Sequence, residues 1–142
     1  MGAEENKRIV RLVEEAWDGQ KLGELDQYFS PKFDNSATAV PGMPPGLEGA
    51  KMAHQASMAS FPDRRVRIED IIADGDQVVV RIRMTGTNKG GLAWLGVPAN
   101  GNKVDFQAIS VYRLAGGKIV EHHAQNDVMT LMQQLGAMPP PG

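Results

Sequence analysis

The 142-residue chain contains no cysteine. This absence excludes disulfides, thiolate nucleophiles, zinc knuckles and iron–sulfur clusters. Long apolar runs are also missing, because no segment approaches the roughly 20 apolar residues that cross a bilayer. The first residues, Met1 to Lys7, lack the apolar segment of a signal peptide. We therefore expect a cytoplasmic protein in which any nucleophile or base is an oxygen or an imidazole.

The chain also lacks a charge excess of either sign. Its 15 basic and 17 acidic residues give a formal net charge of -2, so electrostatics favour neither nucleic acid nor a membrane surface as a partner. The length corresponds to one domain that can bury a core. We predict a single domain over residues 1–142, with its core at about 4–136 and a flexible tail at 137–142.

The first half of the chain has helical periodicity. Apolar residues from Ile9 to Trp17 predict a helix that stops at Asp18-Gly19. A shorter helical pattern covers Leu22 to Phe29, and Ser30-Pro31 closes it because the residue before proline disfavours the helical region. We expect a short extended piece at 33–40 to follow this second helix.

A proline-rich and glycine-rich loop at 41–46 comes next. It is either a lid beside a pocket or a plain connector. A third helix is predicted at about 47–61, with Met52, Ala56 and Ala59 on its inner face.

The second half of the chain changes to the alternation that is typical of strands. Turn signals at Asp74-Gly-Asp76 and Ala115-Gly-Gly117 separate the runs. The predicted strands are 66–72, 77–87, 103–113 and 118–125. Helices followed by an antiparallel meander indicate an α+β domain in which one sheet curls around the N-terminal helices, with a pocket between them.

The last predicted strand carries unusual polarity before a terminal helix. Strict alternation places Glu121, His123 and Asp127 on the same face as Ile119, and His122 on the opposite, exposed face. A carboxylate and an imidazole would then enter the protein together, which is either an expensive structural accident or a site for proton chemistry. The alternative for Asp127 is an N-cap of the helix that follows.

Several motifs, in order, carry a resemblance to a known family. They are Phe61-Pro-Asp63 with 66–73, the strand 75–87, Gly96-Val-Pro98 with Gly101-Asn-Lys103, Tyr112-Arg113, Gly117-Lys-Ile-Val-Glu121, Asp127 and Gln134-Leu-Gly136. On this set, which covers about residues 45–136, the chain resembles the SnoaL-like polyketide cyclases and ester cyclases of the nuclear transport factor 2-like superfamily. The resemblance implies a cone-shaped fold with a curved, mixed sheet, a deep and mostly apolar cavity, and a homodimer or homotetramer.

The same resemblance implies an activity without cofactors. It suggests that Asp127 is the general base of an intramolecular aldol ring closure on a polyketide ester or another small apolar carbonyl compound. An apolar cavity would raise the pKa of this carboxylate and make it a better base near neutrality. His123 is the candidate for polarising a carbonyl, and Gln107 and Asn35 are candidate donors to the oxyanion.

Other residues have two interpretations each. His123 could instead satisfy a hydrogen bond in the core or at a dimer contact. For His54 a solvated helix face is the default, with a cavity-facing role as the alternative. We interpret Trp17, Met52 and Trp94 as core or as the wall of a substrate cavity. No metal site is expected, because His122 and His123 point to opposite faces and Glu121 with His123 supplies only two ligands.

Two positions depart from the family pattern: Asn88 stands where members often carry histidine, and His123 where they often carry tryptophan. A histidine lost at one place and gained at another could preserve an oxyanion donor or mark a different substrate. The departures also leave room for a non-catalytic small-molecule-binding domain. An epoxide hydrolase or a ketosteroid isomerase-like enzyme of the same fold is a further alternative, although hydrolysis needs more buried charge than the sequence locates.

Overall fold

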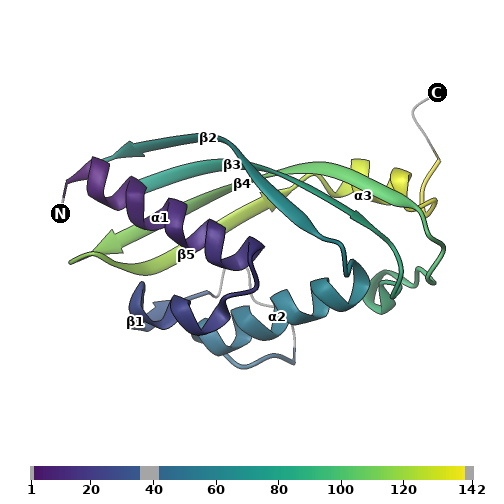
Figure 1. Cartoon of the computed structure of the whole chain (residues 1–142), viewed down its shortest axis with the longest axis horizontal. Helices are drawn as coiled ribbons and strands as arrows, with labels where there is room; N and C mark the ends of the chain where they lie inside the picture. The colour runs from purple at the N-terminus through teal and green to yellow at the C-terminus, as the bar shows by residue number, and fades with distance from the viewer. Residues whose placement is uncertain (1, 36–41, 140–142) are drawn as a thin grey trace.

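The computed structural model describes residues 2–35 and 42–139. The chain forms three α-helices and five strands over these residues, with short 3-10 helices at Leu22–Gln27 and Ala93–Leu95. The helices are α1 (Ala3–Asp18), α2 (Gly46–Ser60) and α3 (Val128–Gln134), and the strands are β1 (Phe29–Asp34), β2 (Arg65–Asp74), β3 (Gln77–Thr87), β4 (Lys103–Ala115) and β5 (Lys118–Asn126). Figure 1 shows α1 lying along the sheet and α3 at the end remote from the N-terminus.

The five strands form one mixed sheet in the order β1-β5-β4-β3-β2. Strands β2 to β5 pair antiparallel with their neighbours, and β1 joins β5 in parallel. The two tight hairpins form where the sequence predicts turns, because Gly75, Gly116 and Gly117 adopt positive φ angles of 60°, 57° and 79°. The predicted α+β class and the curved mixed sheet with N-terminal helices are confirmed.

Two apolar clusters fill the inner side of the sheet. The first joins the stripe of α1 to the inner residues of β1, β3, β4 and β5, among them Val10, Val13 and Ile119. The second lies toward α3 and includes Phe106, Leu131 and Leu135. Within the described part of the chain, no helix is long and apolar enough to cross a membrane.

Strand β4 shows how the interior is divided between these clusters. Its buried residues alternate with exposed ones from Val104 onward, so every second side chain points inward. Phe106 belongs to the second cluster and Tyr112 to the first, while the buried residues between them are the small Ala108 and Ser110. The middle of β4 therefore presents short side chains to the interior.

The structure corrects two local predictions. The second helix ends at Gln27, and Phe29 opens β1, which contains Pro31; β1 is an edge strand, where a residue without an N–H is tolerated. The predicted extended piece extends past Asp34 into 36–40, which lie outside the described residues, as do 41 in the loop and 140–142 in the tail. On α2, Met52, Ala56 and Ala59 are exposed, while Gly49 and His54 are buried.

Candidate functional site

A bulge in β5 reverses the predicted phase of the histidines. Leu114 pairs with Ile119, but the preceding Arg113 pairs with Glu121, so one extra residue of β5 is inserted at Val120. A single inserted residue moves every later side chain to the opposite face. His122 therefore faces inward beside Tyr112, and the side chain of His123 is 57% exposed. The predictions that His123 enters the interior and that His122 is exposed are wrong.

The inward His122 belongs to a buried series of polar side chains that contact one another. Its ring stacks on Tyr112 with centroids 4.5 Å apart, and its Nε2 lies 3.0 Å from the hydroxyl oxygen of Ser110. Burial is the main cause that lowers the pKa of His122 to about 4, and the neighbouring His123 adds to it. His122 is therefore neutral near pH 7.

Glu14 is the carboxylate at the end of this series of side chains. The Tyr112 hydroxyl donates a hydrogen bond of 2.5 Å to its Oε1. Burial raises the pKa of Glu14, while the hydrogen bond from Tyr112 and the charge of Arg64 partly oppose the rise. Burial and the negative charge of Glu14 raise the pKa of Tyr112 well above 10. Tyr112 therefore keeps its proton and remains the donor.

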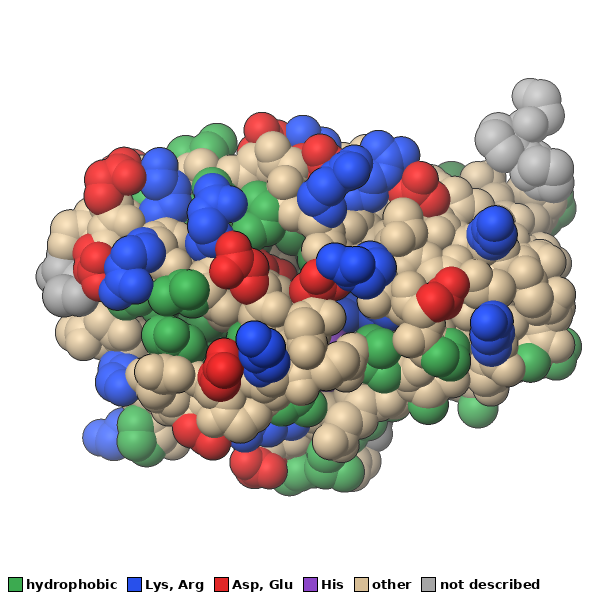
Figure 2. All heavy atoms as spheres, viewed as in Figure 1, with side chains coloured by type: hydrophobic (Ala, Val, Ile, Leu, Met, Phe, Trp, Pro, Cys, Tyr) green, Lys and Arg blue, Asp and Glu red, His purple; other side chains and the backbone are tan. Residues whose placement is uncertain are grey.

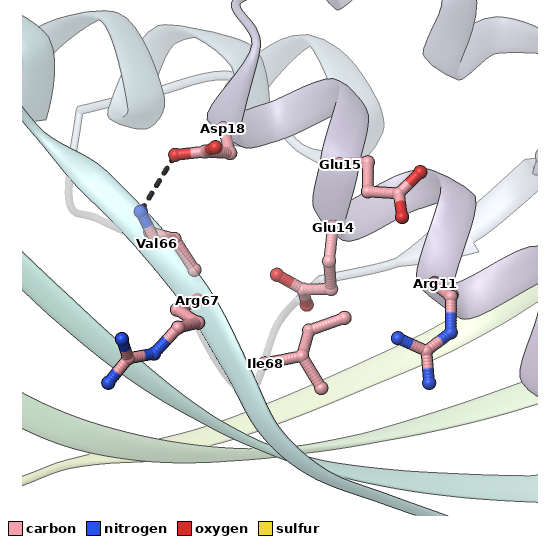
Figure 3. Close-up of a pocket in the computed structure, with 7 residues that line it drawn as sticks. All are labelled: Arg11, Glu14, Glu15, Asp18, Val66, Arg67 and Ile68. Carbon is pink, nitrogen blue, oxygen red and sulfur yellow. Dashed lines mark hydrogen bonds between the residues drawn. The ribbon is translucent and has the colours of Figure 1, made fainter.

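Glu14 also lines a pocket between α1 and β2. Figure 3 shows its carboxylate pointing from α1 toward the strand, whereas Glu15 points away. The pocket has a volume of about 260 Å³, and its seven lining residues are Arg11, Glu14, Glu15, Asp18, Val66, Arg67 and Ile68. Asp18 fixes the edge of β2 because its Oδ1 accepts a 2.7 Å hydrogen bond from the Val66 N–H. A buried carboxylate thus reaches a pocket with a largely charged rim.

A second pocket, of about 450 Å³, includes Arg65, Arg67 and Arg83. Each of these arginines has a carboxylate partner: Asp18, Glu69 and Asp105, respectively. Its charges are therefore mutually satisfied, and it has no buried titratable group comparable to Glu14.

Arg64 and His54 complete the interior polar cluster. Arg64, in the turn between α2 and β2, places Nη1 3.4 Å from Nδ1 of His54. The ring of Trp17 lies 4.9 Å from that of His54, and the two are tilted. The pKa of His54 is lowered to about 4, mainly by burial and also by the charge of Arg64, while the charge of Asp18 partly opposes the shift. His54 is therefore a buried, neutral side chain, and the solvated default is wrong.

Asp127 lies at the surface and caps α3. Its Oδ1 accepts from the Thr130 N–H at 3.1 Å, and its Oδ2 accepts from the Thr130 hydroxyl at 2.7 Å. These two hydrogen bonds lower the pKa of Asp127. The expected rise in an apolar cavity is wrong, because the residue is exposed. The N-cap interpretation is confirmed, and a catalytic role for Asp127 stays a prediction.

The remaining predicted site residues are dispersed. Gln107 is exposed and accepts a hydrogen bond from Arg81, and Asn35 is buried and accepts from the Gly46 N–H at 2.9 Å. Met52 and Trp94 are 45% and 73% exposed, so neither is core. Asn88 is fully buried, and its side chain binds Pro98, Asn100 and Gly91, which organises a loop.

The sequence predictions missed three members of the cluster, which are Glu14, Arg64 and Tyr112. Glu14 had a signal, because it lies four residues after Val10 and three before Trp17, within the apolar stripe of α1. Tyr112 shares the inward phase of β4, but Arg64 has no periodic pattern around it. Within residues 2–35 and 42–139, no three His, Asp or Glu side chains are grouped as a metal site requires.

Comparison with known proteins gives one family and many similar folds. The family model described as SnoaL-like polyketide cyclase matches residues 7–135. A candidate polyketide cyclase from Bacillus cereus is 32% identical, with a TM-score of 0.78 over 94% of this chain and 82% of that one. A candidate SnoaL-like polyketide cyclase from Jannaschia is 27% identical, with a TM-score of 0.80 over 97% and 95%.

Other chemistry is named on the same fold. AclR from Streptomyces galilaeus, described as a candidate hydroxylase, is 24% identical with a TM-score of 0.83 over 99% of this chain and 91% of its own. This likeness concerns the fold alone. No functionally curated protein matches the chain.

Proposed function

Because the chain belongs to the SnoaL-like polyketide cyclase family, we propose that it is a cofactor-free acid–base enzyme acting on a small carbonyl compound. The reaction is an aldol-type ring closure, in which a base removes a proton from carbon beside a carbonyl and the resulting enolate attacks a second carbonyl. The observation that carries the proposal is Glu14, a buried carboxylate with a raised pKa that lines a pocket. A base of this kind acts more efficiently near neutrality than an ordinary carboxylate.

Glu14 is the general base in this proposal. Burial removes water from its charged form and raises its affinity for a proton. Tyr112 holds one carboxylate oxygen by the 2.5 Å hydrogen bond, so the other oxygen is the one to take the substrate proton. After the new carbon–carbon bond forms, Glu14 returns that proton to the alkoxide.

Tyr112 and His122 are positioning residues for Glu14. The stack between their rings and the contact of His122 with Ser110 fix the angle from which the Tyr112 hydroxyl meets the carboxylate. A fixed base costs less reorganisation in the transition state than a mobile one. Two buried residues of β4, Ala108 and Ser110, have short side chains.

Asp127 is the competing base, as the family resemblance suggests. Both of its oxygens are bound to Thr130, and its pKa is lowered. A carboxylate with a lower pKa has a smaller driving force for taking a proton. These contacts favour Glu14 over Asp127.

The experiment measures the first step alone. The protein is mixed with a panel of small β-keto methyl esters in D2O, and proton NMR follows exchange at the carbon between the carbonyls above the spontaneous rate. We expect Glu14→Gln to slow the catalysed exchange by about 100-fold or more, which is the usual scale of general base catalysis. The matched variant Asp127→Asn should stay within about 5-fold of the original protein, because an exposed N-cap holds the helix and does not meet the substrate.

If Asp127→Asn slowed the exchange more than Glu14→Gln did, the general base would be Asp127. Binding of an ester with no exchange above background would instead favour a binding domain. Melting temperatures of both variants serve as the control for folding.

Epoxide hydrolysis is a second candidate, and Arg64 is the observation that favours it. Arg64 is influenced by the negative charges of both Glu14 and Asp18, so the interior holds the buried charge that water activation needs. Burial nevertheless lowers the pKa of Arg64. Incorporation of oxygen-18 from labelled water into a small epoxide, lost in Glu14→Gln, would support hydrolysis in place of aldol closure.

A further inference from the structure

Two nitrogen atoms of the interior cluster have no hydrogen-bond partner in the part of the chain that the structure describes. They are Nε2 of His54 and Nε of Arg64, and both atoms are buried. The His54 side chain belongs to a residue that is 8% exposed. Leaving a buried polar group unpaired costs roughly 1–3 kcal/mol. Two unpaired atoms on two residues that contact each other therefore need a physical explanation.

Both unpaired atoms are donors. A guanidinium can only donate hydrogen bonds, so the 3.4 Å contact makes Nδ1 of His54 the acceptor from Arg64 Nη1. A neutral imidazole with an accepting Nδ1 carries its proton on Nε2. The lowered pKa of His54, about 4, agrees with the neutral form near pH 7. What this pair lacks is therefore an acceptor atom.

The pair lies beside the proposed base. The charge of Arg64 acts on Glu14, and the charge of Asp18 acts on both Arg64 and His54. Glu14 and Asp18 line the pocket between α1 and β2. In Figure 2 a hollow on this face shows histidine and basic side-chain atoms at its floor. Both donor atoms are buried, so a small molecule in the hollow would reach them only after neighbouring side chains move.

We propose that Nε2–H of His54 and Nε–H of Arg64 form a binding subsite for an enolate oxygen, next to Glu14. In the step concerned, the C–H bond of the substrate breaks, its proton goes to the Glu14 carboxylate, and its electron pair moves into a C=C bond while the carbonyl becomes C–O⁻. The guanidinium supplies a positive charge and the imidazole a second donor to that oxygen. This assignment rests on the proposed function for the identity of the ligand, and on the two unpaired donors for its place.

The test uses 4-nitrophenol as the probe, because its phenolate is a planar oxyanion like an enolate and absorbs differently from the phenol. Absorbance titrations with the intact protein give both the dissociation constant and the ionisation state of the bound probe. We expect the bound probe to be the phenolate at a pH where the free probe is largely phenol. His54→Leu and Arg64→Met should each weaken binding by about 10-fold or more, the scale of a charge-assisted hydrogen bond. The matched controls His123→Leu, at an exposed position, and Arg113→Met, at a half-buried one, should bind as the original protein does.

Two further measurements keep the result decisive if a variant fails to fold. His54→Gln, which retains an N–H donor, should recover part of the affinity that His54→Leu loses. In the unmodified protein, nitrogen-15 NMR should show a shift of the His54 Nε2–H signal when the probe is added. Absence of binding, equal binding by every variant, or a His54 signal that stays fixed because only water occupies the site would each overturn the proposal.

Failure of this subsite and failure of the proposed function give different results. If probe binding depends on His54 and Arg64 but β-keto esters do not exchange, the proposed subsite is supported and the proposed enzyme activity is contradicted. If exchange requires Glu14 but is insensitive to His54→Leu and Arg64→Met, the proposed enzyme activity is supported and the proposed subsite is contradicted.

Discussion

Glu14 and Asp127 are both carboxylates, and the fold gives them opposite environments. Glu14 is buried between α1 and the sheet, and burial raises its pKa against the effect of Tyr112 and Arg64. Asp127 is exposed, and two hydrogen bonds from Thr130 lower its pKa. Desolvation and hydrogen bonding, and not the type of residue alone, set the proton affinity of a carboxylate.

The adjacent residues His122 and His123 also have opposite environments, although one peptide bond joins them. The bulge at Val120 turns His122 into the interior, where burial lowers its pKa to about 4, and leaves His123 outside. The polarity of this segment is thus divided between a buried cluster and a surface. Matched substitutions at buried and exposed positions test this division.

The largest effect on stability is expected from the acid titration of His122. Its pKa is about 4 in the folded protein and near 6.5 when unfolded, so between these values the unfolded chain binds more protons. Stability therefore rises with pH through this window and is lost on acidification, by at most about 3 kcal/mol for this residue. His54 contributes in the same sense, and Glu14, with its raised pKa, in the opposite sense above pH 4.5.

His122→Phe keeps a ring on Tyr112 and removes the titration. Urea unfolding at pH 4 and pH 6.5 should show a smaller loss of stability on acidification than in the original protein. His123→Phe is the matched control and should leave the loss unchanged. Equal behaviour of the two variants would show that burial does not separate the two histidines.

The second effect concerns the donor to Glu14. Tyr112→Phe leaves a buried carboxylate without its 2.5 Å hydrogen bond and should lower the free energy of unfolding by roughly 2 kcal/mol. Thr130→Val removes the corresponding hydroxyl contact of the exposed Asp127 and should cost less than about 1 kcal/mol. Urea unfolding at pH 7 measures both, and a larger loss in Thr130→Val would reverse the comparison.

The third effect concerns the helix cap. Asp127→Ala removes the side chain that accepts from Thr130 and should cost about 1 kcal/mol, the usual value for an N-cap. Asp127→Ser restores an acceptor and should recover most of that loss in the same urea experiment. Full stability in Asp127→Ala would contradict the capping role.

Most of the fold could be predicted from the sequence, because alternation and turn chemistry act locally. Strand β3 occupies the predicted 77–87 range, and the two glycine turns fall where they were expected. The first helix follows its apolar stripe to Asp18. The predicted second helix extended into β1 because pairing of Phe29 with Ile119 on β5 is a tertiary contact that local periodicity does not contain.

The candidate site was less predictable for two physical reasons. A bulge changes the phase of a strand without changing its alternating pattern, so His122 and His123 exchanged faces. Burial of a polar side chain depends on what packs over it, and His54 of α2 is packed against Trp17 of α1. Glu14 could have been found, since a carboxylate within an apolar helical stripe is a local anomaly. Arg64, in a turn, could not.

We propose that the acid–base carboxylate lies in the interior at Glu14 and not at Asp127. Carbon-13 NMR of the side-chain carboxyl groups, titrated with pH in the unmodified protein and assigned with Glu14→Gln and Asp127→Asn, tests it most directly. We predict that Glu14 titrates above its ordinary pKa of 4.5 and Asp127 below its ordinary 3.8. Titration of Glu14 at or below 4.5, together with titration of Asp127 above 3.8, would contradict the claim.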